Sequence, residues 1–85
     1  MDERDLAQRA FGLPDKFAGR LAPDDLASVR EFAEAGEWAE ELDLLVAALV
    51  AASQPVSPSE RDELTALLGA AGVPTDPIGR LSVGA

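Results

Sequence analysis

A run of acidic side chains in the middle of the chain is the most prominent group of residues that could do chemistry. Between residues 31 and 43 the sequence places six carboxylates around its single tryptophan, with no Lys or Arg among them. The group consists of Glu31, Glu34, Glu37, Trp38, Glu40, Glu41 and Asp43. Carboxylates can act as general acids and bases, ligate a hard cation, or meet a basic surface of another protein. The rest of the chain helps to decide among these three uses.

The residue types that the chain lacks argue against catalysis and metal binding. With no His, Cys or Tyr, it has no His-based triad, no thiolate nucleophile and no imidazole or thiolate zinc site. The acidic residues lie at the start of a predicted helix, with no apolar cleft evident beside them that would shift a pKa. The calcium-loop pattern Asp-x-Asp-x-Asp-Gly and a glycine-rich phosphate loop are both missing. We therefore predict that the protein is not an enzyme and has no catalytic residue, metal or cofactor.

The negative charge is concentrated in one part of the chain. The net charge is −9, of which residues 31–63 carry −8 and the first 30 residues carry −1. An acidic field repels nucleic acids and anionic lipids and attracts cations, so a partner protein with a basic surface is favoured over nucleic acid or membrane. The alternative interpretation is a solvated helix face that is acidic only for solubility. The sequence leaves both interpretations open.

Length and composition predict one small domain in the cytoplasm. A chain of 85 residues buries only around 60 to 65% of its unfolded surface, so its core should be thin. The absence of Cys excludes disulfides and favours a reducing compartment. The start, MDERDLAQRA, is acidic and unlike a signal peptide, and the longest apolar run, residues 44–52, is about half of a membrane span. We expect a soluble cytoplasmic protein.

The element that must position most of the acidic group is a helix near residues 37–53. One stripe of this helix, at a 3.6-residue period, collects Trp38, Leu42, Leu45 and Leu49, with Val46 and Val50 beside it. The acidic side chains lie off the stripe in the first two turns, and residues 44–52 have no polar side chain. This helix is therefore expected in the middle of the fold. Trp38 should fill space between helices or, alternatively, form a partly exposed aromatic anchor.

Gly36 predicts a break just before this central helix. Gly costs about 1 kcal/mol inside a helix and is the preferred residue just past a helix C-terminus. An earlier helix near residues 24–35 should begin at Pro23, with Asp24 and Asp25 in its first turn, where the helix dipole favours anions. The two helices should form a hairpin or sharp kink, which would bring carboxylates of both into one field.

The last long helix is predicted from its caps. Ser57, Pro58 and Glu60 stand at the N-cap, N1 and N3 positions of a capping box, and Gly72 stands at the C-terminal end. These residues bound a helix over 58–71. No segment alternates in the manner of a β-strand, so we expect no strand.

The two ends of the chain are less regular in sequence. A short first helix is predicted over residues 2–11, with Phe11 on its inner face and Gly12 ending it. Residues 13–22 form either one or two helical turns or an ordered connection, and residues 75–85 form an irregular tail. The predicted fold is all-α: one domain over residues 1–85, a compact bundle of three main helices with a short N-terminal helix closing one side.

About half of the chain, residues 28–73, resembles the MafI-type small immunity proteins encoded beside bacterial polymorphic and contact-dependent toxins. The recurring features there are a helix ending in a Gly-Glu-aromatic step, a Leu-rich helix after it, and a third helix opened by Ser or Pro and acids. The residues that match this pattern are Gly36, Glu37, Trp38, Leu42, Leu45 and Leu49. The resemblance implies a helical inhibitor that binds its cognate toxin in the cytoplasm with no turnover. Many such toxins are nucleases, whose basic surfaces suit an acidic inhibitor.

Two hypotheses about function follow. In the first, the protein neutralises a cognate toxin by binding it through the acidic group and Trp38. In the second, it is an acidic helical adaptor or regulatory subunit that binds a basic protein unrelated to any toxin. A neighbouring gene for a large secreted protein with a small variable C-terminal domain would favour the first, and a metabolic or transcriptional operon would favour the second.

Overall fold

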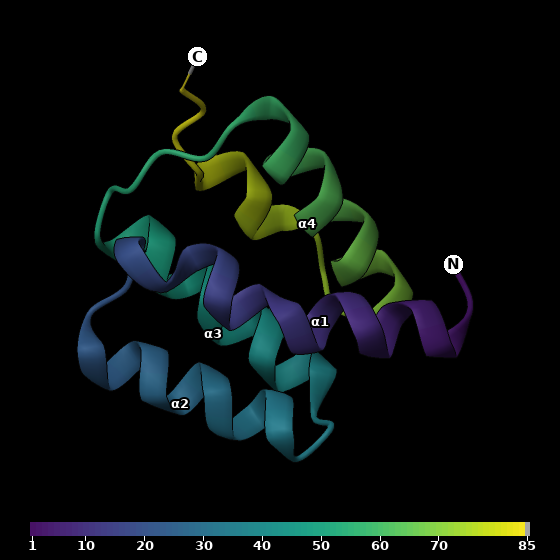
Figure 1. The fold of residues 1–85 in the computed structure, drawn as a ribbon. Coiled ribbons are helices and arrows are strands. Elements are labelled where there is room, and N and C mark those ends of the chain that lie inside the picture. Colours follow the sequence, from purple (N-terminus) through teal and green to yellow (C-terminus); the bar gives the residue numbers. More distant parts are fainter. Residues whose placement is uncertain (85) are drawn as a thin grey trace.

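The helix α3, which spans Trp38–Ala51, lies in the middle of the fold (Figure 1). The computed structural model describes residues 1–84 of the chain. Around α3 pack the helices α1 (Glu3–Phe17), α2 (Pro23–Glu34) and α4 (Pro58–Ala71) and the 3-10 helix η2 (Asp76–Arg80), while a second 3-10 turn, η1 (Ala18–Arg20), follows α1. In Figure 1, α2 and α4 lie on opposite sides of α1 and α3. The all-α prediction is confirmed.

The apolar stripe predicted for the central helix forms the core. Leu42, Leu45 and Leu49 are fully buried, whereas Trp38 and Val50 near the two ends of α3 are partly buried. The stripe packs into one cluster with Leu6, Leu13, Phe17, Val29, Val56, Leu64, Leu67 and Leu68. Burial of apolar surface stabilises the folded state by about 25 cal/mol per Å², so this cluster is the main source of the stability of the bundle.

The first helix is longer than predicted. α1 does not end at Gly12 but continues through Gly12 and Pro14 to Phe17, so the prediction of a short N-terminal helix is wrong. Leu13, Pro14 and Phe17 are buried, and burying them against the other helices outweighs the roughly 3 kcal/mol cost of an interior proline. Phe11 lies off the buried stripe of α1 and is 59% exposed, which contradicts its expected place on the inner face.

The break at Gly36 is confirmed. Gly36 has a φ of +72°, and the amide N–H of Glu37 donates to the carbonyl oxygen of Phe32 (2.9 Å). This bond and the left-handed glycine are typical of the motif that closes a helix C-terminus. The turn separates α2 from α3, within one or two residues of the predicted boundaries.

Both predicted ends of α4 are confirmed. The Ser57 hydroxyl accepts from the amide N–H of Glu60 (3.1 Å), and the Glu60 carboxylate accepts from the amide N–H of Ser57 (2.9 Å). At the other end Gly72 has a φ of +75°, and the amide N–H of Val73 donates to the carbonyl oxygen of Leu68 (2.9 Å). These bonds satisfy backbone groups that a helix end leaves without partners.

A partly buried ion pair, which the sequence did not predict, joins the end of η1 to the start of α4. Arg20 donates two parallel hydrogen bonds to Glu60 (2.8 and 2.7 Å) and a third to the carbonyl oxygen of Pro55 (3.2 Å), and its guanidinium lies 4.4 Å from the centre of the Phe17 ring. These bonds lower the pKa of Glu60 to about 2. Bidentate pairing of this kind fixes the relative orientation of the two side chains as well as pairing their charges. It therefore sets where α4 begins relative to α1.

The C-terminal segment is more ordered than the irregular tail predicted for residues 75–85. It contains η2, a buried Leu81, and an isolated parallel bridge between Val56 and Val83. Residue 85 lies outside the described residues. Within residues 1–84 no β-strand is present beyond this bridge, and no helix combines the length and hydropathy that crossing a bilayer needs.

We predict that Leu45→Ala or Leu49→Ala lowers the free energy of unfolding by about 2 to 5 kcal/mol, because each leaves a cavity in the middle of the core. That loss is a large part of the roughly 5 to 15 kcal/mol that holds a small domain together. Urea unfolding followed by circular dichroism measures it. Leu44→Ala is the matched control, since Leu44 is only partly buried and should lose clearly less. Equal losses at the three positions would contradict the central role of the stripe.

Two glycines give opposite predictions for the same substitution. Gly36→Ala should destabilise by about 1 kcal/mol: an added Cβ would only touch Trp38 (3.8 Å to Cζ2), but the alanine would have to adopt a left-handed backbone conformation. Gly69→Ala, inside α4 with no atom within 4 Å of the added Cβ, should stabilise by a similar amount. The melting temperatures of the two variants test this pair. A rise in both would show that Gly36 is not a true break.

Candidate protein-docking surface

The hairpin between α2 and α3 carries five exposed carboxylates. Glu31, Glu34, Glu37, Glu40 and Asp43, which we call the acidic face, are all solvent-exposed. None of them takes part in an ion pair with another described residue. By contrast, the carboxylates that pair with a cation lie elsewhere, on α1 and α4. The acidic face is therefore a concentration of uncompensated negative charge.

Glu41 does not belong to this face, which corrects the prediction that it contacts a partner. Its side chain is fully buried, and neither carboxylate oxygen has a hydrogen-bond partner in the described part of the chain. The reason is the width of the buried side of α3, which extends around the helix to include Ala48 as well as the leucine stripe. Glu41 falls within that arc, three residues after Trp38 and four before Leu45.

Burial also changes the acid–base behaviour of Glu41. Loss of hydration raises its pKa from the usual 4.5 to about 8, so the expectation that no acid here has a shifted pKa is wrong for this residue. A buried acid with a raised pKa is a candidate catalytic group only where it faces a cleft. Glu41 is not among the residues that line the pocket beside Trp38, and it has no second titratable group bonded to it. We therefore expect Glu41 to affect the stability of the fold.

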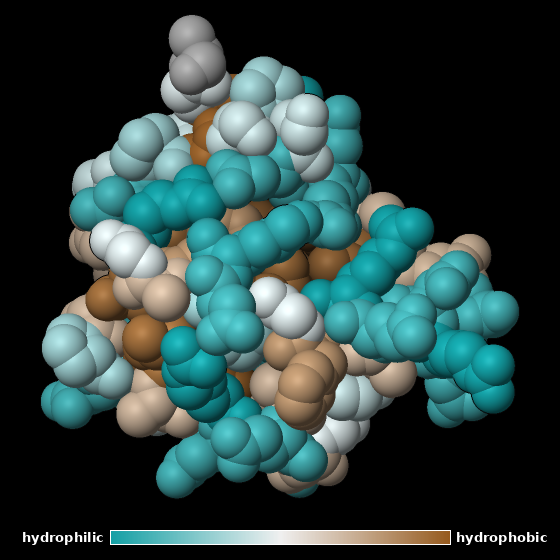
Figure 2. Space-filling view, in the orientation of Figure 1, coloured by the Kyte–Doolittle hydropathy of each residue, from teal (hydrophilic) through white to brown (hydrophobic). Residues whose placement is uncertain are grey.

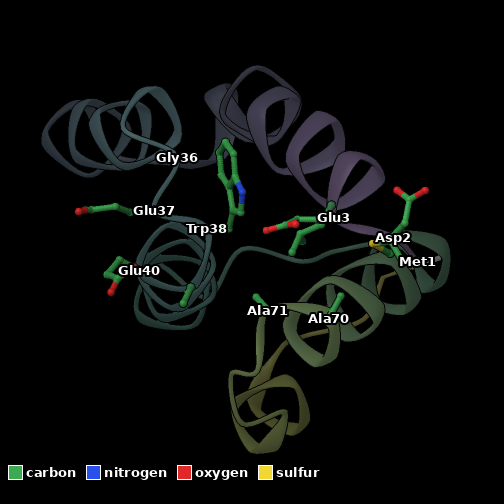
Figure 3. A pocket seen from close by; sticks show the side chains of 11 residues that line it. Met1, Asp2, Glu3, Gly36, Glu37, Trp38, Glu40, Ala70 and Ala71 are labelled. Atoms are coloured by element: carbon green, nitrogen blue, oxygen red, sulfur yellow. The ribbon is translucent and has the colours of Figure 1, made fainter.

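Trp38 combines the two alternatives considered for it. It is partly buried and packs against the core cluster, and its indole also lines a solvent-open pocket of about 500 Å³ (Figure 3). The walls come from four parts of the chain. These are residues 1–3 with Leu6 at the N-terminal end of α1, the turn at Gly36 and Glu37, the first residues of α3, and Ala70 and Ala71 on α4. Trp38 is therefore both a core residue and an accessible aromatic surface.

The pocket brings together two acidic groups from distant parts of the sequence. Glu37 and Glu40 come from the acidic face, and Asp2 and Glu3 come from the start of α1. In Figure 3 the Glu3 side chain points toward Trp38, whereas Glu37 and Glu40 extend outward from the mouth. Apart from the α-amino group of Met1, no lining residue is positively charged. The pocket thus has an apolar interior and an acidic rim.

The other predicted docking residues lie outside this pocket. Glu31 and Glu34 are on α2 and Asp43 is on α3, all exposed but none lining the pocket. Sequence reasoning did not place Asp2 and Glu3 at the site, because they stand at the start of the first predicted helix, far from Trp38 in the sequence. Asp2 does serve there, since its carboxylate accepts from the amide N–H of Asp5 (2.8 Å). Only the folded chain shows that this helix start lies beside Trp38.

Figure 2 shows the surface in the orientation of Figure 1. Hydrophilic side chains cover most of that face, and apolar side chains show in the gaps between them.

Within residues 1–84 no group of three or more Asp and Glu side chains is arranged to hold a metal ion. The acidic face and Trp38 can present carboxylates and one aromatic ring to a cationic surface.

From the shifted pKa values of Glu41 and Glu60 we predict that the stability of the protein is greatest near pH 5. Folded Glu41 keeps a proton that the unfolded chain releases, so the free energy of unfolding should fall by on the order of 4 kcal/mol as pH rises from 4.5 to 8. Glu60, with its pKa lowered to about 2, acts oppositely: its contribution is lost as pH falls from 4.5 toward 2. Urea unfolding at a series of pH values measures both slopes.

Glu41→Gln separates the buried acid from the general repulsion among acids. This variant should lose most of the decline between pH 5 and pH 8, because its amide does not titrate. Glu40→Gln is the matched control, since it makes the same change one residue away at an exposed position and should keep the decline. An unchanged pH profile in Glu41→Gln would show that the buried carboxyl does not set it.

The acidic face and the pocket beside Trp38 are the features of the structure that bear on function. Comparison with protein-family models, with curated proteins and with solved structures finds no match to this chain.

Proposed function

We propose that this protein acts by binding a basic protein partner, as an immunity protein that neutralises a cognate bacterial toxin in the cytoplasm. The observation that carries the proposal is the acidic face: five exposed carboxylates on α2, the Gly36 turn and α3 that form no ion pair within residues 1–84. A basic partner would supply the missing counter-charges. No enzymatic turnover is involved, and the inhibitor acts stoichiometrically.

The distribution of the chain's own cations supports this proposal. Lys16 pairs with Glu63 (2.7 Å), Arg20 with Glu60 (2.7 Å) and Arg30 with Asp15 (2.9 Å). These three ion pairs join α1 and η1 to α4 and α1 to α2, and none of them involves a carboxylate of the acidic face. Like charges held close together destabilise a compact protein. A partner that relieves this repulsion on binding gains affinity from it.

Electrostatic docking also suits the task of an inhibitor. A charged patch steers its partner and raises the association rate, and complementary charges fix the orientation of the complex. Toxins that act on nucleic acids need basic surfaces to hold phosphates, so an acidic inhibitor can cover the same surface. The resemblance to MafI-type immunity proteins around Gly36, Glu37 and Trp38 points to this class of partner, and the same residues form the turn and the pocket wall in the fold.

We predict that the triple reversal Glu34→Lys, Glu37→Lys and Glu40→Lys lowers the affinity for the protein encoded by the adjacent gene by at least 100-fold at low salt. All three positions are exposed, so the helical content should not change. The loss should shrink at high salt, where exposed charges are screened. Copurification with that neighbour, followed by calorimetry at low and high salt, measures the effect.

The matched control reverses three exposed acids outside the acidic face: Asp24→Lys, Asp62→Lys and Asp76→Lys. It changes the net charge equally, so it isolates position from total charge. Its affinity should fall much less than that of the first variant. Equal losses would mean that total charge, and not this face, determines binding. No binding of the parent protein by the neighbour's product would contradict the toxin partner, and a metabolic partner in its place would support an adaptor.

A further inference from the structure

The pocket beside Trp38 is large enough to receive a side chain of another molecule. Its volume of about 500 Å³ falls within the range of about 300 to 1,000 Å³ that is usual for small-ligand pockets. One wall is the partly buried indole of Trp38, and the other lining residues include small or apolar side chains: Leu6, Ala70 and Ala71. Small side chains on α4 leave the space beside the indole open.

The charge of the lining residues determines which kind of group fits the pocket. Asp2, Glu3, Glu37 and Glu40 all lie at this pocket, and none has an ion-pair partner within residues 1–84. Glu3 is the carboxylate that points toward the indole (Figure 3). A group that enters must therefore be apolar on its faces, where it meets Trp38, and positive at its edge, where it meets the carboxylates.

A guanidinium group meets both requirements better than an ammonium. It is planar, stacks on aromatic rings, is weakly hydrated for a cation, and carries donors around its edge that match a carboxylate. A Lys ammonium is a compact and strongly hydrated charge, so it would lose more hydration beside the indole. No Lys or Arg of this chain lines the pocket, so the group must come from another molecule.

We infer that the Trp38 pocket receives one arginine side chain of the partner protein, with its guanidinium stacked on the indole and donating hydrogen bonds to Glu3. Glu37 and Glu40 at the mouth attract this arginine from the partner's basic surface and link the pocket to the acidic face. The inference rests on the proposed function for the source of the arginine. The acidic face gives long-range attraction, and the pocket gives a fixed point of docking.

The test uses N-acetyl-L-arginine amide as the probe and Trp38 as the reporter. Trp38 is the single tryptophan of the chain, so its fluorescence and its indole N–H resonance report on this pocket alone. The probe should shift the indole resonance along a binding curve. N-acetyl-L-citrulline amide, which has nearly the same shape and no charge, should bind at least fivefold more weakly. Equal shifts with both compounds, or none with the arginine compound, would overturn the inference.

Two variants test the geometry with the same probe. Glu3→Gln should weaken the binding at least threefold, whereas Glu31→Gln, the same change on the exposed surface of α2, should not alter it. Ala70→Leu should narrow the pocket and weaken the binding of the probe while the helical content stays that of the parent, because Ala70 is exposed on α4 and Leu is a good helix former. Full binding by Glu3→Gln or by a folded Ala70→Leu would overturn the inference.

Failure of the inference is distinguishable from failure of the proposed function. Calorimetry with the adjacent gene product should show at least a tenfold loss of affinity for Ala70→Leu. If that variant binds the product as tightly as the parent does, while reversal of the acidic face prevents binding, the pocket inference is wrong and the proposed function stands. If the parent does not bind the product, the toxin partner is wrong, and the probe titration decides the pocket separately.

Discussion

Burial of the apolar side of α3 is the constraint on which the rest of the structure depends. This helix packs against α1, α2, α4 and η2, so each of these elements is placed by covering it. Its N-terminal residue, Trp38, lies at the end of the buried stripe and stays partly open. The hydrophobic core and the candidate docking surface are therefore parts of the same helix. A change that moves α3 would move both the indole and the carboxylates around it.

The same burial explains why Glu41 differs from its neighbours. The interior side of α3 is wider than the leucine stripe, and a carboxyl within it loses its hydration without gaining a hydrogen bond. The acidic face adds repulsion among exposed carboxylates of the α2–α3 hairpin. Both features lower stability at neutral pH and above. A partner that compensates the face would add stability to the bundle, because ligands that bind only the folded state stabilise it.

Features encoded by neighbouring residues could be predicted from the sequence, and features made by distant residues could not. Gly36, the Ser57–Glu60 capping box and the leucine stripe depend on local spacing, and all three were predicted correctly. The continuation of α1 past Pro14 depends on where Phe17 packs, which local propensity does not reveal. The Arg20–Glu60 pair spans 40 residues. In the candidate site, Glu37, Trp38 and Glu40 were predicted to act together, but Glu3 reaches them only through the packing of α1.

Chemical-shift mapping of the ¹⁵N-labelled protein with its copurified neighbour tests the docking surface most directly, because every amide reports separately. We expect the largest shifts at residues 34–40, with a second group at residues 2–6 and 70–71 around the pocket. Amides of Arg20, Val56, Ser57 and Glu60 should change little, since these residues line a separate hollow that contains no residue of the acidic face or of the Trp38 pocket. Large shifts confined to these four residues, with the hairpin unaffected, would contradict docking at the hairpin.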